Sequence, residues 1–573
     1  MTEGLLVERN VRVPMRDGVE LAADVWRRAD GEAAPVLLQR TPYNKDMAAS
    51  PEIFRMASAG YAVVVQDTRG RYASGGRFEP FANEADDGED TIAWLVEREW
   101  CDGAVGGFGS SYVGATQWLA AARAPAGLRA IAPNITASDY HEGWTYQGGA
   151  LQLGFTLTWA LMFLGLGEVA RQLGTRDATP GDLGAAIANA DRLHELYAHA
   201  PLMTMPGLDG VAEYWRDWLR HPGYDGHWSP HAPRERYEDV VAPAFNIGGW
   251  YDLFLAGTLE NYRGMRARGG SEAARRPRLL IGPWAHANVT GDFPERAFGL
   301  PGGALLADVT GRQLRWFDHH LRGADNGLAG EPPVRLFVLG ANVWTDEQDW
   351  PLPDARDERL HLRADGVLAP EAPAGREPED VLTYDPADPV PTVGGATFLP
   401  GLLVGANAGP RDQRAVEARA DVLCFTTAPL ERPVAVIGEV TLVLHAASSC
   451  PDTDFTAKLV DVHPDGRAEI LCDGILRARY RDSLSAPSPL EPGRPYELHI
   501  AVGATANLFR AGHRIRLEIS SSNFPRFDRN TNTGGVIAEE GPEDWRVAVN
   551  RVFHDEHRPS HLLLPRVERD WAQ

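Results

Sequence analysis

The spacing of apolar positions divides the chain into stretches of different character. Residues 5–13, 19–26 and 35–39 alternate between apolar and polar positions, which predicts β-strands. Residues 61–66 are continuously apolar, as expected of a parallel strand buried on both faces. Residues 84–97 combine helical spacing with an acidic start that suits the helix dipole. Strands that alternate with helices predict a doubly wound α/β sheet.

This alternation is interrupted once and then resumes. From about residue 138 to 235 the strand signals vanish, and helical spacing with many leucine, alanine and tryptophan residues predicts an inserted helical unit. The pattern of strands and helices then continues over residues 244–247, 254–266, 278–281, 311–321 and 334–339. We therefore expect the α/β sheet to be built from two separate parts of the chain.

The C-terminal part of the chain follows another pattern. A proline-rich, helix-poor stretch up to about residue 400 precedes short strand-like segments such as 440–444, 455–462 and 514–519. Short strands separated by turns favour a β-sandwich or jelly roll as a separate domain. At 573 residues the chain is too long for a single core. The predicted division is an α/β domain over 1–138 and 236–350, a helical insert over 139–235 and a β domain over 351–573.

Charge excludes two classes of partner. The formal net charge is −23, while the apolar (44%) and charged (24%) fractions are those of an ordinary globular protein. A surface this acidic repels phosphate backbones and anionic lipids, so we expect neither a nucleic-acid partner nor a membrane surface. The apolar run over 153–167 is shorter than the roughly 20 residues that a membrane-spanning helix needs, and it predicts a buried or pocket-lining helix.

The N-terminus and the cysteines indicate in which cellular compartment the protein is expected. The N-terminus has no basic start followed by an apolar run, so no secretory signal is predicted. The four cysteines are widely spaced and form no CxxC motif, which favours free thiols and speaks against a zinc site. A cytoplasmic protein is therefore expected. The sequence leaves a homo-oligomer open.

The stretch GGFGSSYVG (106–114) is the strongest candidate for catalysis. An apolar run precedes it and a helix-like run follows it, which is the layout of a nucleophile elbow that lifts a serine above a sheet. Gly109 stands two residues before Ser111, where a tight turn needs a positive φ and close backbone approach. Val113 stands at +2 and Gly114 at +3, so the match to G-x-S-x-G is imperfect. A plain glycine-rich turn between a strand and a helix stays open.

A serine nucleophile needs a base and a carboxylate that orients the base. Asp252 follows the predicted strand 244–247, and His286 follows the predicted strand 278–281. Both stand just past the carboxyl end of a strand, where open α/β sheets bind ligands, and the order Ser, Asp, His is that of α/β hydrolases. Alternatives remain, because an aspartate before a helix is often its N-cap and most of the 17 histidines should have no catalytic role.

The tetrahedral intermediate of acyl transfer needs two hydrogen-bond donors for its oxyanion. The backbone N–H of Tyr112, which follows the candidate nucleophile, is one candidate donor. The sequence has no HGGG-type stretch for the second donor, but Tyr43 follows the predicted strand 35–39 and could offer its phenolic O–H. Alternatively, Tyr43 merely packs on Pro42.

Together these residues resemble the cocaine esterase group of the X-prolyl dipeptidyl-peptidase-like acyl esterases, over nearly the whole chain. That family's G-x-S-Y-x-G variant accounts for the glycine at +3. Further blocks that look like the family are TPY (41–43), GWYD (249–252), GPWAHAN (282–288), TDFTAKLVDVHPDGRA (453–468) and SSSNFPRFDRNTNTGG (520–535). The resemblance implies an α/β-hydrolase domain with an inserted helical domain and a C-terminal β jelly-roll domain.

The resemblance also implies roles for single residues. Ser111 corresponds to the nucleophile, Asp252 to the orienting acid and His286 to the base, with Tyr43 and the N–H of Tyr112 as the oxyanion hole. The aromatic residues that it places in the acyl pocket, where ordinary helix packing is the alternative, are Trp144, Trp159 and Phe254. A jelly-roll loop near 397–404 should complete the pocket, although the chain carries extra residues at 400–403. No metal and no organic cofactor are implied.

The expected substrate is a small uncharged aryl or acyl ester, such as a benzoyl ester. The nearest alternatives are an X-Pro dipeptidyl-peptidase and an α-amino-acid ester hydrolase, which must bind a free ammonium group with buried carboxylates. The apolar residues 253–255 after Asp252 speak against both, whereas Asp139 and Glu142 could still supply negative charge. A catalytically dead binding protein is the alternative of another class.

Overall fold

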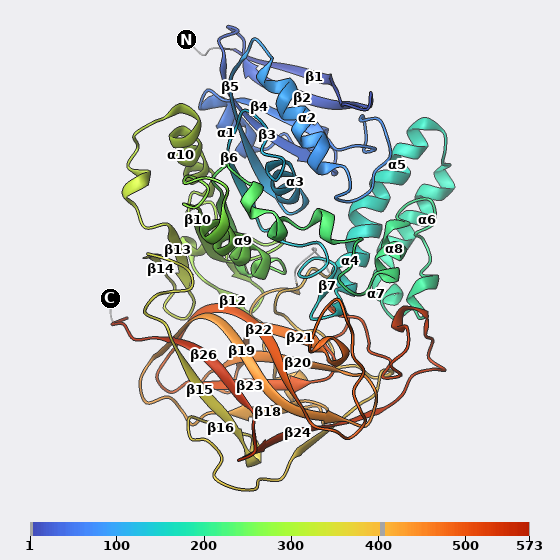
Figure 1. Ribbon diagram of the computed structural model, residues 1–573, viewed down its shortest axis with the longest axis vertical. Coiled ribbons are helices and arrows are strands. Elements are labelled where there is room, and N and C mark those ends of the chain that lie inside the picture. Colours follow the sequence, from blue (N-terminus) through green and yellow to red (C-terminus); the bar gives the residue numbers. More distant parts are fainter. Residues whose placement is uncertain (1–3, 401–406, 572–573) are drawn as a thin grey trace.

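The structure is a computed structural model, and it describes residues 4–400 and 407–571 (Figure 1). The strands of its first sheet lie in the order β1-β2-β4-β3-β5-β6-β9-β10-β13-β14. The strands from β4 to β13 are parallel, whereas β1, β2 and β14 pair antiparallel with their neighbours. The bounds are β1 (Leu5–Pro14), β2 (Glu20–Arg28), β3 (Ala34–Thr41), β4 (Ala62–Asp67), β5 (Cys101–Ser110), β6 (Leu128–Asn134), β9 (Phe245–Tyr251), β10 (Arg278–Ala285), β13 (Val334–Val338) and β14 (Val343–Glu347).

Helices cover both faces of this sheet, which confirms the predicted α/β class. One hydrophobic cluster packs α2 (Glu84–Val96), α3 (Tyr112–Ala121) and α9 (Leu255–Arg268) on the strands. Another packs α1 (Pro51–Ser58) and α10 (Val309–Arg322) on them. Every residue of β4 is buried, as predicted for a strand between two helical layers. The sequence pattern did not predict α1 or the edge strand β14.

The chain between β6 and β9 forms α4 (Leu153–Thr158), α5 (Leu166–Thr175), α6 (Pro180–Asp191), α7 (Leu193–Leu196) and α8 (Tyr214–Arg220), beside the sheet (Figure 1). This stretch is not helical throughout, because a short hairpin, β7 (Tyr146–Gln147) and β8 (Ala150–Leu151), comes first. A π-helical segment, Trp159–Gly165, joins α4 to α5.

The resulting continuous helix, Leu153–Thr175, has 23 residues and is longer than the apolar run predicted. By length and composition alone it could cross a membrane, but 67% of its apolar window is buried inside the protein. That burial is what the core helix of a soluble protein shows, and it agrees with the predicted buried helix.

The C-terminal part forms a second sheet, and its longest strands exceed the short segments predicted from the sequence. β19 has 15 residues and β22 has 14, and they pair antiparallel. The bounds are β15 (Arg356–Arg363), β16 (Val367–Ala369), β17 (Asp380–Tyr384), β18 (Leu423–Thr426), β19 (Val434–Ser448), β20 (Asp454–Val462), β21 (Ala468–Arg477), β22 (Tyr496–Phe509), β23 (Arg514–Ser520), β24 (Ala548–Asp555), β25 (Arg558–Pro559) and β26 (His561–Val567).

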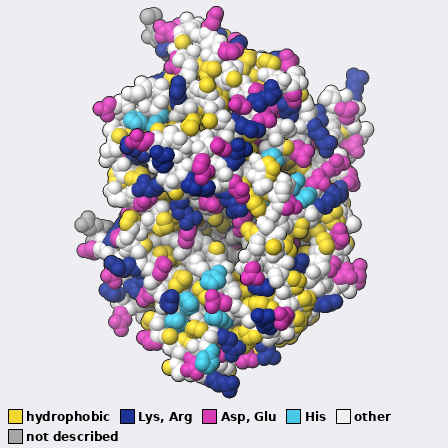
Figure 2. All heavy atoms as spheres, viewed as in Figure 1, with side chains coloured by type: hydrophobic (Ala, Val, Ile, Leu, Met, Phe, Trp, Pro, Cys, Tyr) yellow, Lys and Arg dark blue, Asp and Glu magenta, His cyan; other side chains and the backbone are white. Residues whose placement is uncertain are grey.

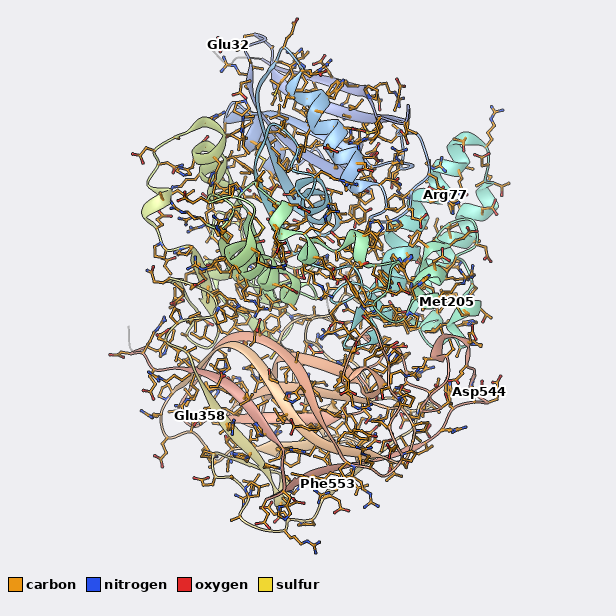
Figure 3. The ribbon with its side chains drawn as sticks, in the orientation of Figure 1. Glu32, Arg77, Met205, Glu358, Asp544 and Phe553 are labelled. Carbon is orange, nitrogen blue, oxygen red and sulfur yellow. The ribbon has the colours of Figure 1, made fainter. Side chains whose placement is uncertain are left out.

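One hydrophobic cluster joins the two sheets. It contains Trp250 and Phe337 from the first sheet together with Leu442 and Val502 from the second. Side chains fill the space between them (Figure 3). On the surface, acidic and basic side chains are interspersed over the visible face (Figure 2). All four cysteines are free thiols, as predicted.

Candidate active site

The turn between β5 and α3 holds Ser111 in a strained conformation. Its backbone angles are φ 61° and ψ −126°, a region that residues with a side chain rarely adopt. Gly109 before it has φ 126°, and a Cβ there would lie 2.3 Å from the Val113 side chain. A Cβ on Gly114 would lie 2.8 Å from Thr136. The two glycines therefore allow the sharp strand-to-helix turn that presents Ser111 at the carboxyl edge of the sheet.

The three predicted partners lie within contact distance at this edge. Asp252 directly follows β9 and His286 directly follows β10. The Nε2 atom of His286 is 3.0 Å from Oγ of Ser111, and its Nδ1 atom is 3.3 Å from both carboxylate oxygens of Asp252. Asp252 is 2% exposed and also accepts the N–H of Phe254 at 2.6 Å. The carboxylate thus orients the imidazole ring, and it is not the N-cap of α9, because Phe254 is the N-cap residue and α9 has no side-chain cap hydrogen bond.

Tyr43 lies beside the candidate nucleophile. Its hydroxyl accepts the indole N–H of Trp159 at 2.8 Å and interacts with Ser111. Burial raises the pKa of Tyr43 to about 12, although its bonds to Trp159 and Ser111 act in the opposite direction. The phenol is therefore a neutral donor at ordinary pH. Because the hydroxyl already accepts the indole proton, its own proton is free for an acceptor near Ser111.

Tyr112 is anchored behind the candidate nucleophile. Its hydroxyl donates to Glu84 at 2.9 Å and accepts the N–H of Phe81 at 2.9 Å. Glu84 in turn forms a buried ion pair with Arg40 at 2.9 Å. The backbone N–H of Tyr112 stands at the first position of α3, where it has no acceptor within the helix. That N–H and the Tyr43 phenol are the two candidate oxyanion donors.

Aromatic side chains surround the site. Trp144 and Phe254 stack with ring centroids 4.3 Å apart, and Phe254 meets His286 edge-on at 5.0 Å. Trp159 lies 5.6 Å from Trp144. The three predicted pocket residues therefore form one aromatic cluster, which contacts the imidazole through Phe254.

Two further aromatic residues were missed by the sequence reasoning. Phe398 meets His286 edge-on at 5.1 Å, and Phe155 lies 5.3 Å from Phe254 and 5.8 Å from Phe398. Phe155 could have been found, because it stands four residues before Trp159 on the same helical face. Phe398 belongs to the loop predicted to reach the pocket, where Leu399 also contacts Gly154. Residues 401–406 of that loop lie outside the described residues.

The two carboxylates near Trp144 in the sequence are already engaged. Asp139 is fully buried and pairs with Arg234 at 2.7 Å. Glu142 accepts the N–H of Gly148 at 3.0 Å, and burial raises its pKa to about 7. Asp139 is thus neutralised by a guanidinium, and Glu142 tends to keep its proton.

One group of metal-binding residue types lies away from this site, in the C-terminal domain. Asp461, His463 and His513 offer ligand atoms within 4.8 Å of one another. His513 bonds Asp461 at 2.8 Å, and Nη2 of Arg467 is 3.0 Å from His463. A guanidinium that close opposes a second cation, so this group is satisfied by its own contacts.

Family models match most of the chain. Residues 17–288 match the X-Pro dipeptidyl-peptidase (S15 family) model. Residues 326–563 match the X-Pro dipeptidyl-peptidase C-terminal non-catalytic domain. The first match contains Ser111, Asp252 and His286. The second covers the C-terminal β domain.

Known relatives cover the chain almost completely. A cocaine esterase from Rhodococcus sp. (strain MB1 Bresler) is 43% identical over 98% of this chain and 99% of its own length. An aminopeptidase from a marine sediment Thaumarchaeota archaeon is 26% identical, with a TM-score of 0.82 over 98% of this chain and 96% of its own. An α-amino acid ester hydrolase is 27% identical, with a TM-score of 0.79 over the same shares. The chain therefore belongs to the X-Pro dipeptidyl-peptidase-like acyl esterases, and within them to the cocaine esterase group.

Proposed function

We propose that this chain is a serine carboxylic-ester hydrolase that cleaves uncharged aryl and acyl esters, such as benzoyl esters, through an acyl-enzyme intermediate. The observation that carries the proposal is the 3.0 Å contact between Oγ of Ser111 and Nε2 of His286. A histidine base at this distance activates a serine that is otherwise a weak nucleophile. Ser111 is half-buried, and the strained turn presents it at the carboxyl edge of the sheet.

In the proposed mechanism, Oγ of Ser111 attacks the ester carbonyl carbon while Nε2 of His286 takes the hydroxyl proton. Asp252 holds the ring by Nδ1 and stabilises the imidazolium that forms. The oxyanion receives hydrogen bonds from the Tyr43 phenol and the Tyr112 N–H. The imidazolium then protonates the departing alcohol. A water molecule, deprotonated by His286, attacks the acyl-enzyme and releases the acid.

The surroundings of the triad support an uncharged acyl group. Phe254 and Phe398 meet the imidazole edge-on, and Trp144 stacks on Phe254. Apolar side chains favour a flat apolar group such as benzoyl. The carboxylates that could attract an ammonium group, Asp139 and Glu142, are held by Arg234 and a backbone N–H. The relative named cocaine esterase also supports an ester rather than a peptide.

The test compares two substrates side by side. Purified protein is given an aryl benzoyl ester and an Xaa-Pro anilide, with Ser111→Ala as the blank. The proposal predicts hydrolysis of the ester alone. Release of the anilide would overturn it in favour of a peptidase, and turnover of neither by folded protein would favour a catalytically dead binding protein.

The second candidate is an enzyme that binds an α-ammonium group. The similarity to an aminopeptidase and to an α-amino acid ester hydrolase favours it. Such an enzyme needs a charged carboxylate near the nucleophile. A glycine or alanine ester hydrolysed faster than its N-acetylated form would support this candidate.

The finer architecture is also a proposal. We propose that residues 139–235 form a helical cap over an α/β-hydrolase domain (1–138 and 236–350), because Trp144 of this stretch stacks on Phe254 and Trp159 donates to the Tyr43 hydroxyl. The antiparallel pairing of β19 with β22 and β26 supports a jelly roll over residues 351–573.

The acidic surface and free thiols support a cytoplasmic enzyme without nucleic-acid or membrane partners. Small-angle scattering would establish whether it is a homo-oligomer.

A further inference from the structure

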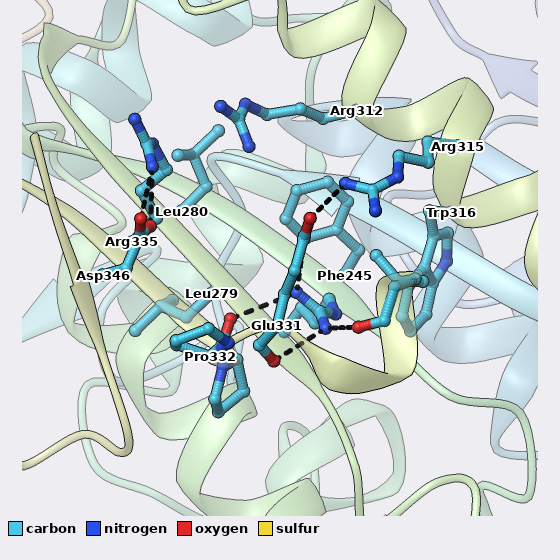
Figure 4. A pocket seen from close by; sticks show the side chains of 13 residues that line it. Phe245, Leu279, Leu280, Arg312, Arg315, Trp316, Glu331, Pro332, Arg335 and Asp346 are labelled. Carbon is cyan, nitrogen blue, oxygen red and sulfur yellow. Dashed lines mark hydrogen bonds and ion pairs between the residues drawn. The ribbon is translucent and has the colours of Figure 1, made fainter. Parts of the chain in front are cut away.

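A second pocket lies at the other end of the same strands. It has a volume of about 280 Å³ and lies where α10, β13 and β14 meet the beginnings of β9 and β10 (Figure 4). Phe245 begins β9 and Arg278 begins β10, whereas Asp252 and His286 follow the last residues of these strands. The six residue steps from Phe245 to Tyr251 span roughly 20 Å. This pocket is therefore separate from the triad.

The lining of this pocket carries an excess of positive charge. Two ion pairs compensate part of it, Arg315 with Glu331 and Arg335 with Asp346, each at 2.6 Å. The ionised side chains in the lining are Arg278, Arg312, Arg315, Arg335, Glu331 and Asp346. Four cations against two anions leave a formal charge of +2 in a chain whose net charge is −23. Such a local reversal of sign attracts anions.

Two of the four guanidinium groups lack a carboxylate of their own. Arg278 donates to the backbone carbonyls of Leu328, Glu331 and Pro332, and its nearest carboxylate, at 3.8 Å, already pairs with Arg315. Arg312 donates from Nε to the carbonyl of Ala307 at 3.0 Å, and none of the ion pairs between described residues includes it. Burial lowers the pKa of both arginines, although nearby carboxylates act in the opposite direction.

The lining of this pocket also has an apolar part. Phe245 and Trp316 lie with ring centroids 5.9 Å apart, and Leu279 and Leu280 line the pocket as well. Figure 4 shows Arg335 on the opposite side of the space from Trp316. A ligand that fits must therefore carry an anionic head and an apolar body.

We propose that this pocket binds a small organic oxyanion, with its carboxylate or phosphate head on Arg312, whose guanidinium has no carboxylate partner among the described ion pairs, and its apolar body against Phe245 and Trp316. A guanidinium is suited to such a head because its planar fork donates two parallel hydrogen bonds. The proposal does not rest on the proposed ester hydrolysis, because none of these residues contacts the triad.

Calorimetric titration of the full chain tests the proposal. The probes are benzoate, phenyl phosphate, inorganic phosphate and neutral benzyl alcohol. We expect benzoate or phenyl phosphate to bind at one site per chain, and the tighter of the two identifies the head as carboxylate or phosphate. Benzyl alcohol binding equally well would overturn the anionic head. Inorganic phosphate binding as tightly as phenyl phosphate would overturn the apolar body.

Variants locate the binding. Arg312→Gln should weaken it about 10- to 100-fold, since a hydrogen bond to a charged group is lost, and Arg312→Lys should weaken it less. The matched control is Arg129→Gln, at an exposed arginine of β6, which should leave binding unchanged. Ester hydrolysis by Arg312→Gln should stay within twofold of wild type, which also shows that the variant is folded. Unchanged affinity in Arg312→Gln would overturn the assignment.

Discussion

Replacement of Tyr43 by phenylalanine separates catalysis from packing. The change removes one oxygen, which the structure places between Trp159 and Ser111. If the phenol is one of two oxyanion donors, kcat falls by about 10²–10³, which corresponds to about 2.7–4 kcal/mol of transition-state stabilisation. The KM should change little, because the hydrogen bond strengthens only as charge develops on the carbonyl oxygen.

The same substitution has a stability cost that can be measured independently. Trp159 is 2% exposed, and its indole N–H would lose its acceptor. A buried unsatisfied donor costs about 1–3 kcal/mol, so the free energy of unfolding should fall by that amount. Trp159→Phe is the matched control, because it removes the indole donor but leaves the phenol in place, and it should lower kcat by only about tenfold.

The assay combines initial rates on an aryl benzoyl ester with denaturant unfolding of each variant. The reasoning predicts a large loss of kcat in Tyr43→Phe together with a moderate loss of stability. A kcat within threefold of wild type in a folded Tyr43→Phe protein would refute the role of Tyr43 as a donor. A change confined to KM would point to substrate binding instead.

Three other substitutions test separate parts of the account. Asp252→Asn should lower kcat by about 10⁴ with the fold intact, as for a lost orienting carboxylate; rates within tenfold of wild type would contradict this. Gly109→Ala should lower both Tm and activity, because its Cβ would lie 2.3 Å from Val113, whereas Gly174→Ala, with open space around it, should not lower Tm. The Glu142 carboxyl has a pKa raised to about 7 by burial, so the folded state binds its proton more tightly than the unfolded state does. Its stabilising contribution is therefore complete at acidic pH and is lost towards pH 7, and Glu142→Gln should gain stability relative to wild type from pH 5 to 8, by at most about 1.4 kcal/mol per pH unit. A free energy of unfolding that varies with pH in the same way in both proteins across that range would contradict this prediction.

The parts of the site that could be read from the sequence are those with a local signal. Ser111 stands in a glycine pattern, and Asp252 and His286 stand at the ends of apolar strands whose order the α/β topology fixes. Each of these positions depends on a few neighbouring residues. The contacts of Ser111, His286 and Asp252 could therefore be predicted without knowledge of long-range packing.

Contacts between distant segments could not be read in this way. The bond between Trp159 and Tyr43 joins two elements that are 116 residues apart, and Phe398 reaches His286 from the C-terminal part of the chain. The ion pair of Arg40 and Glu84 behind the candidate nucleophile is also non-local. Such pairs depend on how whole elements pack, which no local pattern encodes.

Some misses did have a local signal. Helix α1 has a serine N-cap followed by proline at its first position, and both are known start signals. Its short length of eight residues hid the periodicity. The long strand β19 was predicted only over 440–444, and β22 was not among the predicted segments; pairing with β22 and β26 extends β19 beyond that short apolar run.

The most direct test of the central claim is covalent labelling of the nucleophile. Folded protein is treated with a fluorophosphonate probe, which reacts only with an activated serine, and the labelled peptide is identified by mass spectrometry. The account predicts one label per chain, on Ser111, with normal labelling in Ser110→Ala and none in Ser111→Ala or His286→Ala. A label on Ser110, or no label on wild-type protein that is shown to be folded, would contradict the claim that Ser111 is an activated nucleophile.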